Sequence, residues 1–125
     1  MTLSPTDSQI ILIEADKALR EALSHVLSME KHDVRGFDHM DAALAAWNPK
    51  MTSLIIVELD NFQAPESGPR AIRRAGFAGP ILAMSTNGEN EVPALATGAD
   101  AFLRKPLRIP QLFHEITRLL TTPHS

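Results

Sequence analysis

Two acidic segments follow short apolar runs, and each holds two carboxylates separated by one residue. The first run leads into Glu14 and Asp16, and the second leads into Glu58 and Asp60. Such runs, bounded by polar residues, are typical of strands buried inside a parallel sheet. The carboxyl ends of these strands flank the crevice where open α/β sheets bind ligands. Because clustered carboxylates repel one another unless a cation or proton intervenes, the sequence predicts a metal and phosphate site or its altered remains.

Two further polar side chains follow later apolar runs. Ser85 comes after the fourth run and Lys105 after the fifth. Carboxylates can hold Mg²⁺, a hydroxyl can donate to a phosphoryl oxygen, and a lysine supplies a point charge. Each residue alone is ordinary at the start of a loop. The whole set in this order indicates a site for a phosphoryl group with a divalent cation.

Strand and helix patterns alternate five times along the chain, without a repeat or a linker. Expected strands cover 10–13, 32–37, 54–59, 80–84 and 101–103, and the expected helices cover 17–27, 39–47, 68–74, a short segment within 87–97, and 110–120. This alternation predicts an α/β fold, a doubly wound five-stranded parallel sheet of the flavodoxin-like (βα)5 type with strand order 2-1-3-4-5. Both acidic segments then flank the switch point between strands 1 and 3.

Local signals set the expected helix ends. Asp16 and Asp38 each precede a helical stripe of apolar residues and are expected to act as N-caps. Pro49 ends the second helix, and Pro110 suits the first position of the last one. Pro93 interrupts a polar segment, so the fourth helix is expected to be short or irregular.

Composition limits the classes of function. The 125 residues are expected to form a single domain over 1–125, and the absence of cysteine excludes disulfides and thiolate metal sites. The net charge of −3 argues against a nucleic-acid surface, and no apolar run approaches the ~18 residues of a membrane helix. No basic, apolar signal peptide opens the chain, so a cytoplasmic location is expected. The five histidines are scattered and indicate no zinc site.

Three stretches, 11–21, 83–86 and 98–107, resemble the receiver domain of two-component response regulators. The resemblance covers residues 9–121, and its most specific part is Gly-Ala-Asp-Ala-Phe-Leu-Arg-Lys-Pro-Leu at 98–107. It implies an acidic pair after strand 1, a phosphoacceptor after strand 3 and a cis peptide bond before Pro106. It also implies a switch hydroxyl at Ser85, a rotating aromatic at Phe102 and the amine of the site at Lys105.

Two positions depart from the family pattern. The second acid after strand 1 supplies a metal ligand in the family, and here that position is Ala15. The acceptor position after four apolar residues is Glu58 rather than aspartate. The metal site, for which Glu14, Asp16, Glu58 and Asp60 are the candidates, is therefore expected to be weak or lost. Mg²⁺ binding would be weak, and no other cofactor is expected.

The acceptor position has an alternative assignment. Family members usually have a glycine eight residues after the acceptor, and Gly68 lies eight residues after Asp60. Assigning Asp60 as the acceptor therefore requires no insertion in the loop. Glu58 would then be buried in a central strand without a partner, which is costly. The Glu58 assignment needs two extra loop residues, which surface loops tolerate. We favour Glu58 and keep Asp60 as the alternative.

The favoured function is a pseudo-receiver: a non-enzymatic module with weak or no Mg²⁺-dependent phosphorylation that signals through protein contacts. The expected partners are a sensor histidine kinase or a downstream signalling protein, bound on the face of the fourth helix, fifth strand and last helix, including His114, Thr117 and Arg118. Homodimerisation stays open, and no direct nucleic-acid or membrane partner is expected. One alternative is a receiver phosphorylated on Asp60, with self-phosphorylation and self-dephosphorylation. A remote alternative is an unrelated flavodoxin-like domain that binds a small ligand such as flavin.

Overall fold

A five-stranded parallel sheet with order β2-β1-β3-β4-β5 forms the centre of the protein. The structure is a computed structural model that describes residues 9–121. The strands are β1 (Gln9–Ile13), β2 (Asp33–Phe37), β3 (Thr52–Glu58), β4 (Ile81–Ser85) and β5 (Ala101–Arg104). The helices are α1 (Lys17–Met29), α2 (Met40–Ala46), α3 (Ser67–Arg74), α4 (Glu91–Ala96) and α5 (Ile109–Thr121), with 3₁₀ turns at Pro49–Met51 and Gly88–Asn90. The predicted fold class and strand order are confirmed.

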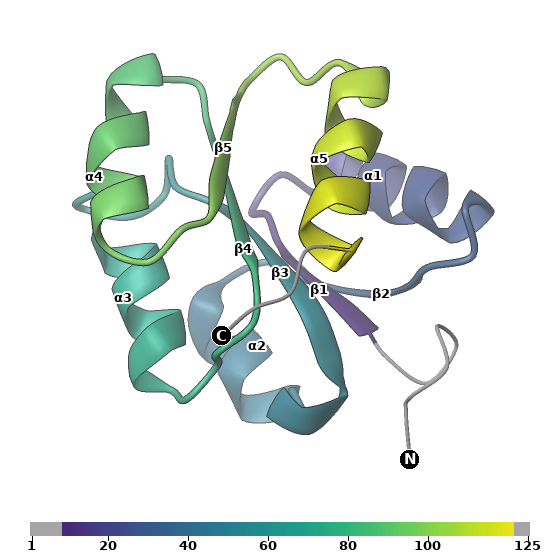
Figure 1. The fold of residues 1–125 in the computed structure, drawn as a ribbon, viewed down its shortest axis with the longest axis horizontal. Coiled ribbons are helices and arrows are strands. Elements are labelled where there is room, and N and C mark those ends of the chain that lie inside the picture. Colours follow the sequence, from purple (N-terminus) through teal and green to yellow (C-terminus); the bar gives the residue numbers. More distant parts are fainter. Residues whose placement is uncertain (1–8, 122–125) are drawn as a thin grey trace.

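Helices cover both faces of the sheet. Figure 1 shows α1 and α5 on one side and α2, α3 and α4 on the other. Alternate residues of β1 divide between two buried clusters. Ile10 and Leu12 pack with α1 and α5, whereas Ile11 and Ile13 pack with the opposite helices. Because both faces are buried, the middle residues of the central strands are apolar on both sides of the sheet, which is why they appear in the sequence as continuous runs.

Two local features refine the predicted helices. The N-cap of α2 is His39, and the Asp38 carboxylate instead lies 2.5 Å from the ring Nδ1 of His39, so the prediction of an Asp38 cap was wrong. The six residues of α4 confirm that this helix is short. Pro93 lies in its first turn, where the backbone N–H groups have no partner within the helix, so proline is tolerated there.

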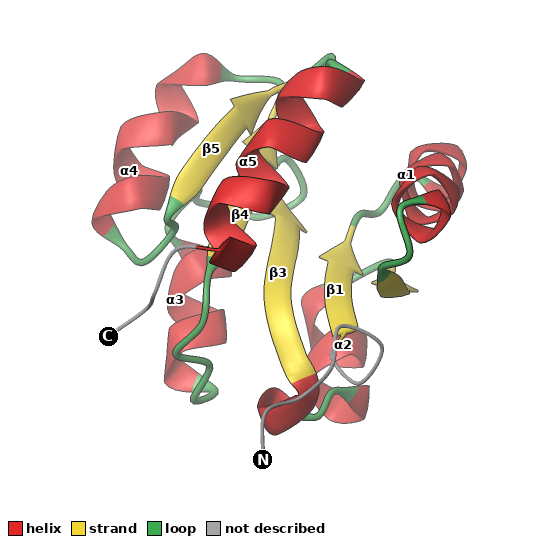
Figure 2. Ribbon diagram, turned by 45° about the vertical axis from the view of Figure 1, so that its right-hand side comes forward, coloured by secondary structure: helices red, strands yellow, loops and turns green. Residues whose placement is uncertain are grey.

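The strand register brings distant residues to one edge of the sheet. Figure 2 shows the arrows of β1, β3, β4 and β5 pointing toward the same end. Glu58 of β3 pairs with Met84 of β4, and Ser85 pairs with Arg104 of β5. The residues after β1, β3, β4 and β5 therefore meet at the carboxyl edge. Within residues 9–121, no helix combines the length and apolar character needed to cross a membrane.

Arg73 ties α3 to the far end of the sheet, and its loss is expected to destabilise the fold. Its guanidinium donates to Asp100 Oδ2 at 3.0 Å and to three backbone carbonyls. Those carbonyls belong to Phe77, Gly79 and Gly98, at 2.9, 2.6 and 2.7 Å. Arg73→Ala should lower the free energy of unfolding by about 2 kcal/mol, because these part-buried acceptors lose a charged donor.

Urea denaturation of Arg73→Ala measures this loss. Arg70→Ala is the matched control, because Arg70 is exposed on the same helix and its replacement should change stability by less than about 0.5 kcal/mol. Equal stability of Arg73→Ala and the parent protein would show that the four contacts contribute nothing.

Candidate functional site

Lys105, on the loop after β5, lies between two buried carboxylates. Its Nζ is 2.7 Å from Glu14 Oε1 and 3.8 Å from Glu58 Oε1. The side chains of Glu14 and Glu58 are each 2% exposed, and that of Lys105 is 14% exposed. Two carboxylates removed from water need a nearby cation, and the ammonium of Lys105 supplies it. The peptide bond from Lys105 to Pro106 is cis, as the resemblance implied.

Both carboxylate oxygens of Glu58 have hydrogen-bond donors. The backbone N–H of Asp60 donates to Oε1 at 2.5 Å, and Asn61 Nδ2 donates to Oε2 at 3.0 Å. Burial raises the pKa of Glu58 to about 7, and the hydrogen-bonded side chain of Asp60 adds to the rise. Near neutral pH this carboxyl group is therefore protonated in a large share of the molecules.

The carboxylate of Asp60 accepts hydrogen bonds from the residues at the end of β4. Its Oδ1 accepts from the hydroxyl of Ser85 at 2.5 Å, and the Thr86 N–H donates to both oxygens at 3.2 and 3.1 Å. Partial burial alone would raise the pKa of Asp60, but the hydrogen bonds from Ser85, Glu58 and Thr86 outweigh it and lower the pKa. The pKa of Glu58 is therefore raised and that of Asp60 lowered, although only one residue separates them.

The hydroxyl of Ser85 uses all of its hydrogen-bonding capacity. It donates to Asp60 and accepts from the Asn87 N–H and from Asn90 Nδ2, both at 3.0 Å. The residue is fully buried. A hydroxyl has one donor and two acceptor lone pairs, so its orientation is fixed by these three contacts. Ser85 thus connects the loop after β3 to the segment that precedes α4.

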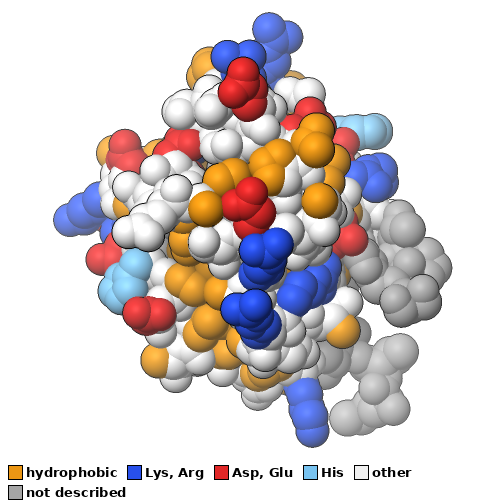
Figure 3. Space-filling view, turned by 90° about the vertical axis from the view of Figure 1, so that its left-hand side faces the viewer, with side chains coloured by type: hydrophobic (Ala, Val, Ile, Leu, Met, Phe, Trp, Pro, Cys, Tyr) orange, Lys and Arg blue, Asp and Glu red, His pale blue; other side chains and the backbone are white. Residues whose placement is uncertain are grey.

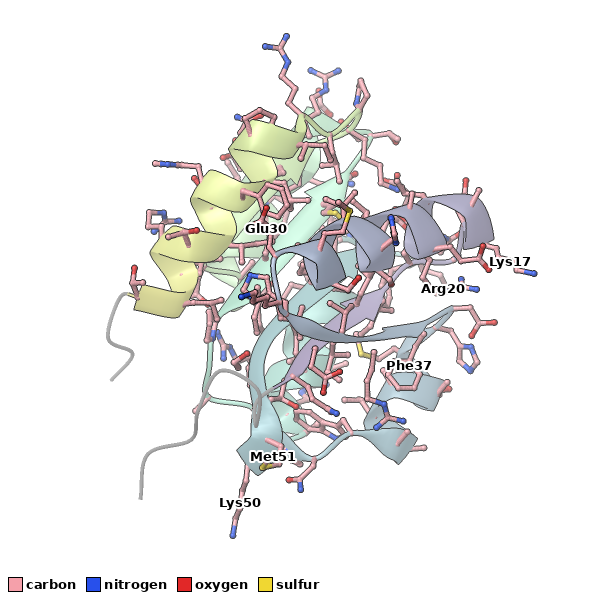
Figure 4. The ribbon with its side chains drawn as sticks, turned by 90° about the vertical axis from the view of Figure 1, so that its right-hand side faces the viewer. Lys17, Arg20, Glu30, Phe37, Lys50 and Met51 are labelled. Carbon is pink, nitrogen blue, oxygen red and sulfur yellow. The ribbon has the colours of Figure 1, made fainter. Side chains whose placement is uncertain are left out.

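The end of β1 contributes one carboxylate to the site and one to a helix. Glu14 Oε2 accepts from the Asp16 N–H at 3.1 Å, and its backbone carbonyl accepts from Arg20 Nη1 at 2.7 Å. Figure 4 shows Arg20 on α1, on the side toward β2. The side chain of Asp16 instead accepts from the Leu19 N–H at 3.1 Å, which confirms its predicted capping role. Ala15 between them is exposed and adds only a methyl group.

The structure therefore gathers five of the predicted residues: Glu14, Glu58, Asp60, Ser85 and Lys105. Asp16 is used at the start of α1, and Phe102 is half-buried on β5, packed against the apolar cluster beneath α2, α3 and α4. In the part of the chain that the structure describes, no three histidine or acidic side chains are arranged to hold a metal ion.

Sequence reasoning missed Asn61 and Asn90 as partners of the site. Asn61 is three residues beyond Glu58, a spacing at which an amide can turn back to a strand-end carboxylate, so the sequence held a weak signal for it. Asn90 reaches Ser85 through the 3₁₀ turn Gly88–Asn90, and no pattern in the sequence links these two side chains. The Thr86 N–H left no signal in the sequence because every residue except proline has one.

The stability of the protein is expected to fall as pH rises from 5 to 8. Folding raises the pKa of Glu58 from 4.5 to about 7, so the folded state binds a proton more tightly than the unfolded state in this window. Stability is therefore highest below the unfolded value and is lost as pH rises toward the folded one, by roughly 2 kcal/mol. Asp60 has a lowered pKa, so its contribution to stability is lost only at more acidic pH.

Glu58→Gln should flatten this pH dependence because the amide does not titrate. Denaturant unfolding of both proteins across the pH window measures the effect. Every other titratable group is common to the two proteins, so the informative quantity is the difference in slope between parent and variant. Identical slopes would show that Glu58 is ionised throughout the window in both states.

Known proteins resemble this chain over nearly its whole length. The family model described as the response regulator receiver domain matches residues 10–117. The response regulator protein FleR of Pseudomonas aeruginosa is 29% identical over 114 residues, which cover 89% of this chain and 24% of that protein. The chain thus spans about a quarter of the length of this curated relative.

Solved structures show the same fold. The receiver domain of NtrX from Brucella abortus superimposes with a TM-score of 0.81 at 25% identity, covering 92% of this chain and 100% of that one. The BeF3-activated N-terminal receiver domain of Klebsiella pneumoniae RstA gives a TM-score of 0.81 at 18% identity, with the same coverage.

Proposed function

This chain belongs to the response regulator receiver domain family of two-component signalling, and we propose that it is a pseudo-receiver that signals through protein contacts. The observation that carries the proposal is the chemistry at the end of β1. Ala15 stands where the family resemblance implies a metal-ligating acid, and the neighbouring Glu14 is paired with Lys105 at 2.7 Å. In this proposal Mg²⁺-dependent phosphorylation is weak or absent.

The residues present fit a magnesium ion poorly. Mg²⁺ prefers six oxygen ligands in near-octahedral geometry, and proteins usually supply carboxylates for it. Ala15 offers no side-chain oxygen, and Asp16 caps α1. The oxygens of Glu14 and Glu58 already accept hydrogen bonds or pair with Lys105. We therefore derive no step that passes through a metal ion.

Glu58 is also a poor phosphoacceptor in this setting. A nucleophilic carboxylate must be ionised and accessible, whereas Glu58 is buried with its pKa raised to about 7. Asp60 is the alternative acceptor, because it is exposed and its pKa is lowered. Its two oxygens, however, are engaged by Ser85 and Thr86, which favours a role in holding the structure.

Receiver domains interact with histidine kinases and other signalling proteins, and here we propose the face of α4, β5 and α5 as the contact surface. On α4, Val92 is 75% exposed and Leu95 is 42% exposed. A hollow beside them is lined by Leu95, Phe102 and Arg118, among others. Figure 3, which looks onto the side of α3 and α4, shows apolar side chains exposed among charged ones. Exposed apolar groups rimmed by charges are typical of protein-binding surfaces.

Intact mass spectrometry after incubation with acetyl phosphate and Mg²⁺ tests the proposal. We expect no phosphoryl adduct on the parent protein. A stoichiometric adduct would overturn the proposal, and the Asp60→Asn variant then identifies the acceptor. An adduct that disappears in Asp60→Asn would support the alternative of a receiver phosphorylated on Asp60.

A further inference from the structure

The hydroxyl of Ser85 and the backbone N–H of Thr86 converge on a single anion. Both donate to the carboxylate of Asp60, at 2.5 Å and at 3.1 to 3.2 Å. Two donors directed at one group of oxygens form a small anion-binding site. The anion that fills the site comes from the chain itself, on the loop after β3.

We infer that Asp60 is a resident anion in this site and that it fixes the segment between β4 and α4 in one conformation. The inference rests on the proposed function, because a built-in anion acts continuously only if no phosphoryl group takes its place. It goes further by naming Asp60 as the group that occupies the Ser85 and Thr86 donors and by naming the segment that this group holds in place.

The contacts that transmit the effect are short and direct. The proton of Ser85 points to Asp60, which leaves the lone pairs of Ser85 for the Asn87 N–H and for Asn90 Nδ2, both at 3.0 Å. Asn90 closes the 3₁₀ turn that leads into α4. Without Asp60, the Ser85 hydroxyl could turn its proton elsewhere, and two contacts of the segment would weaken with it.

The segment also lies against β5. A side chain added at Gly88 would meet the side chain of Arg104 at 3.5 Å, and the Lys105 N–H donates to the Ser85 carbonyl at 2.8 Å. A change in the conformation of the segment would therefore alter its contacts with the residues at the end of β5. The resident anion thus stabilises the surface that α4 and β5 present to a partner.

Asp60→Ala vacates the site and tests the inference. Hydrogen exchange should become at least about tenfold faster at the amides of residues 86–96, as expected for losing a hydrogen bond to a charged group. Added acetate should bind in the vacated site, shift the Thr86 and Asn87 amide resonances saturably, and restore slow exchange. Acetate should leave the parent protein unchanged because Asp60 already fills the site.

Three further variants make the test specific. Ser85→Ala should also speed exchange, but acetate should not restore it, because one of the two donors is gone. Asp60→Asn keeps the shape and removes the charge, so its exchange should be intermediate, and it serves if Asp60→Ala does not fold. Asp41→Ala removes an exposed carboxylate on α2 and should behave as the parent does.

Unchanged exchange at 86–96 in both Asp60 variants would overturn the inference. So would faster exchange in Asp60→Ala that acetate cannot reverse, because the vacated donors would then not form an anion site. Neither experiment uses Mg²⁺ or a phosphodonor. Phosphorylation of the parent protein would thus refute the proposed function, whereas the hydrogen-exchange and acetate results would still test the role of Asp60 independently.

Discussion

Lys105→Met is expected to lower the free energy of unfolding by about 3 kcal/mol near pH 8. The ammonium lies 2.7 Å from Glu14 and 3.8 Å from Glu58, and both carboxylates are almost completely buried. Methionine fills a similar volume but leaves both carboxylates without a cation. Removing one partner of a buried ion pair is strongly destabilising because the remaining charge has lost its access to water.

A double-mutant cycle separates this charge effect from packing. Glu14→Gln in the Lys105→Met background should recover much of the lost stability, because the uncompensated charge is then removed. Lys50→Met, at an exposed position outside the site, is the control and should change stability little. Denaturant unfolding measures the parent protein, Lys105→Met, Glu14→Gln, the double variant and the Lys50→Met control. A loss as small as that of Lys50→Met would show that Lys105 does not compensate the buried carboxylates.

The combined variant Ala15→Asp/Glu58→Asp is expected to take up a phosphoryl group under conditions in which we expect the parent protein to take up none. The first change returns a carboxylate oxygen to the end of β1, and the second shortens the overlong acid at the end of β3. With acetyl phosphate and Mg²⁺, intact mass spectrometry should show one added phosphoryl group. Mg²⁺ alone should also raise the thermal stability of this variant, because an ion that binds only the folded state stabilises it.

The control is Ala15→Asp/Glu58→Asn, which has the restored metal ligand but no nucleophile at position 58. It should gain no phosphoryl group. Adding Asp60→Ala to the combined variant should increase the yield, because Asp60 no longer occupies the Ser85 and Thr86 donors. If this triple variant also stays unmodified, Ala15 and Glu58 are not what limits phosphorylation in this cleft.

The sheet was predictable because its strands are buried on both faces. Ile10 to Ile13 alternate between two apolar clusters, so the run is continuous and easily recognised. The residues that cap the helices were predicted less accurately. Asp16 caps α1 as predicted, whereas Asp38 pairs with the adjacent His39. An aspartate placed before a helix can bond to the helix N–H groups or to another nearby side chain. The conformation of the loop determines which of these contacts forms.

The sequence predicted which residues form the site, but it predicted only some of the contacts between them. The order of the parallel strands dictates that Glu14, Glu58, Ser85 and Lys105 meet at one edge. The sequence offered Glu58 and Asp60 as alternatives for one position. In the structure each acid has its own partners, Lys105 for Glu58 and Ser85 for Asp60. This division depends on the path of the loop after β3, which tertiary contacts set and local pattern does not encode.

We propose that a methyl group at Ala15 and an overlong acid at Glu58 deprive the cleft of metal-supported phosphoryl chemistry. The most direct test is to record backbone amide resonances while Mg²⁺ and beryllofluoride, a phosphoryl mimic, are added to the parent protein. We expect no saturable shifts at Ala15, Glu58 or Thr86 at millimolar concentrations. Saturable shifts at these three amides that require both Mg²⁺ and beryllofluoride would contradict it.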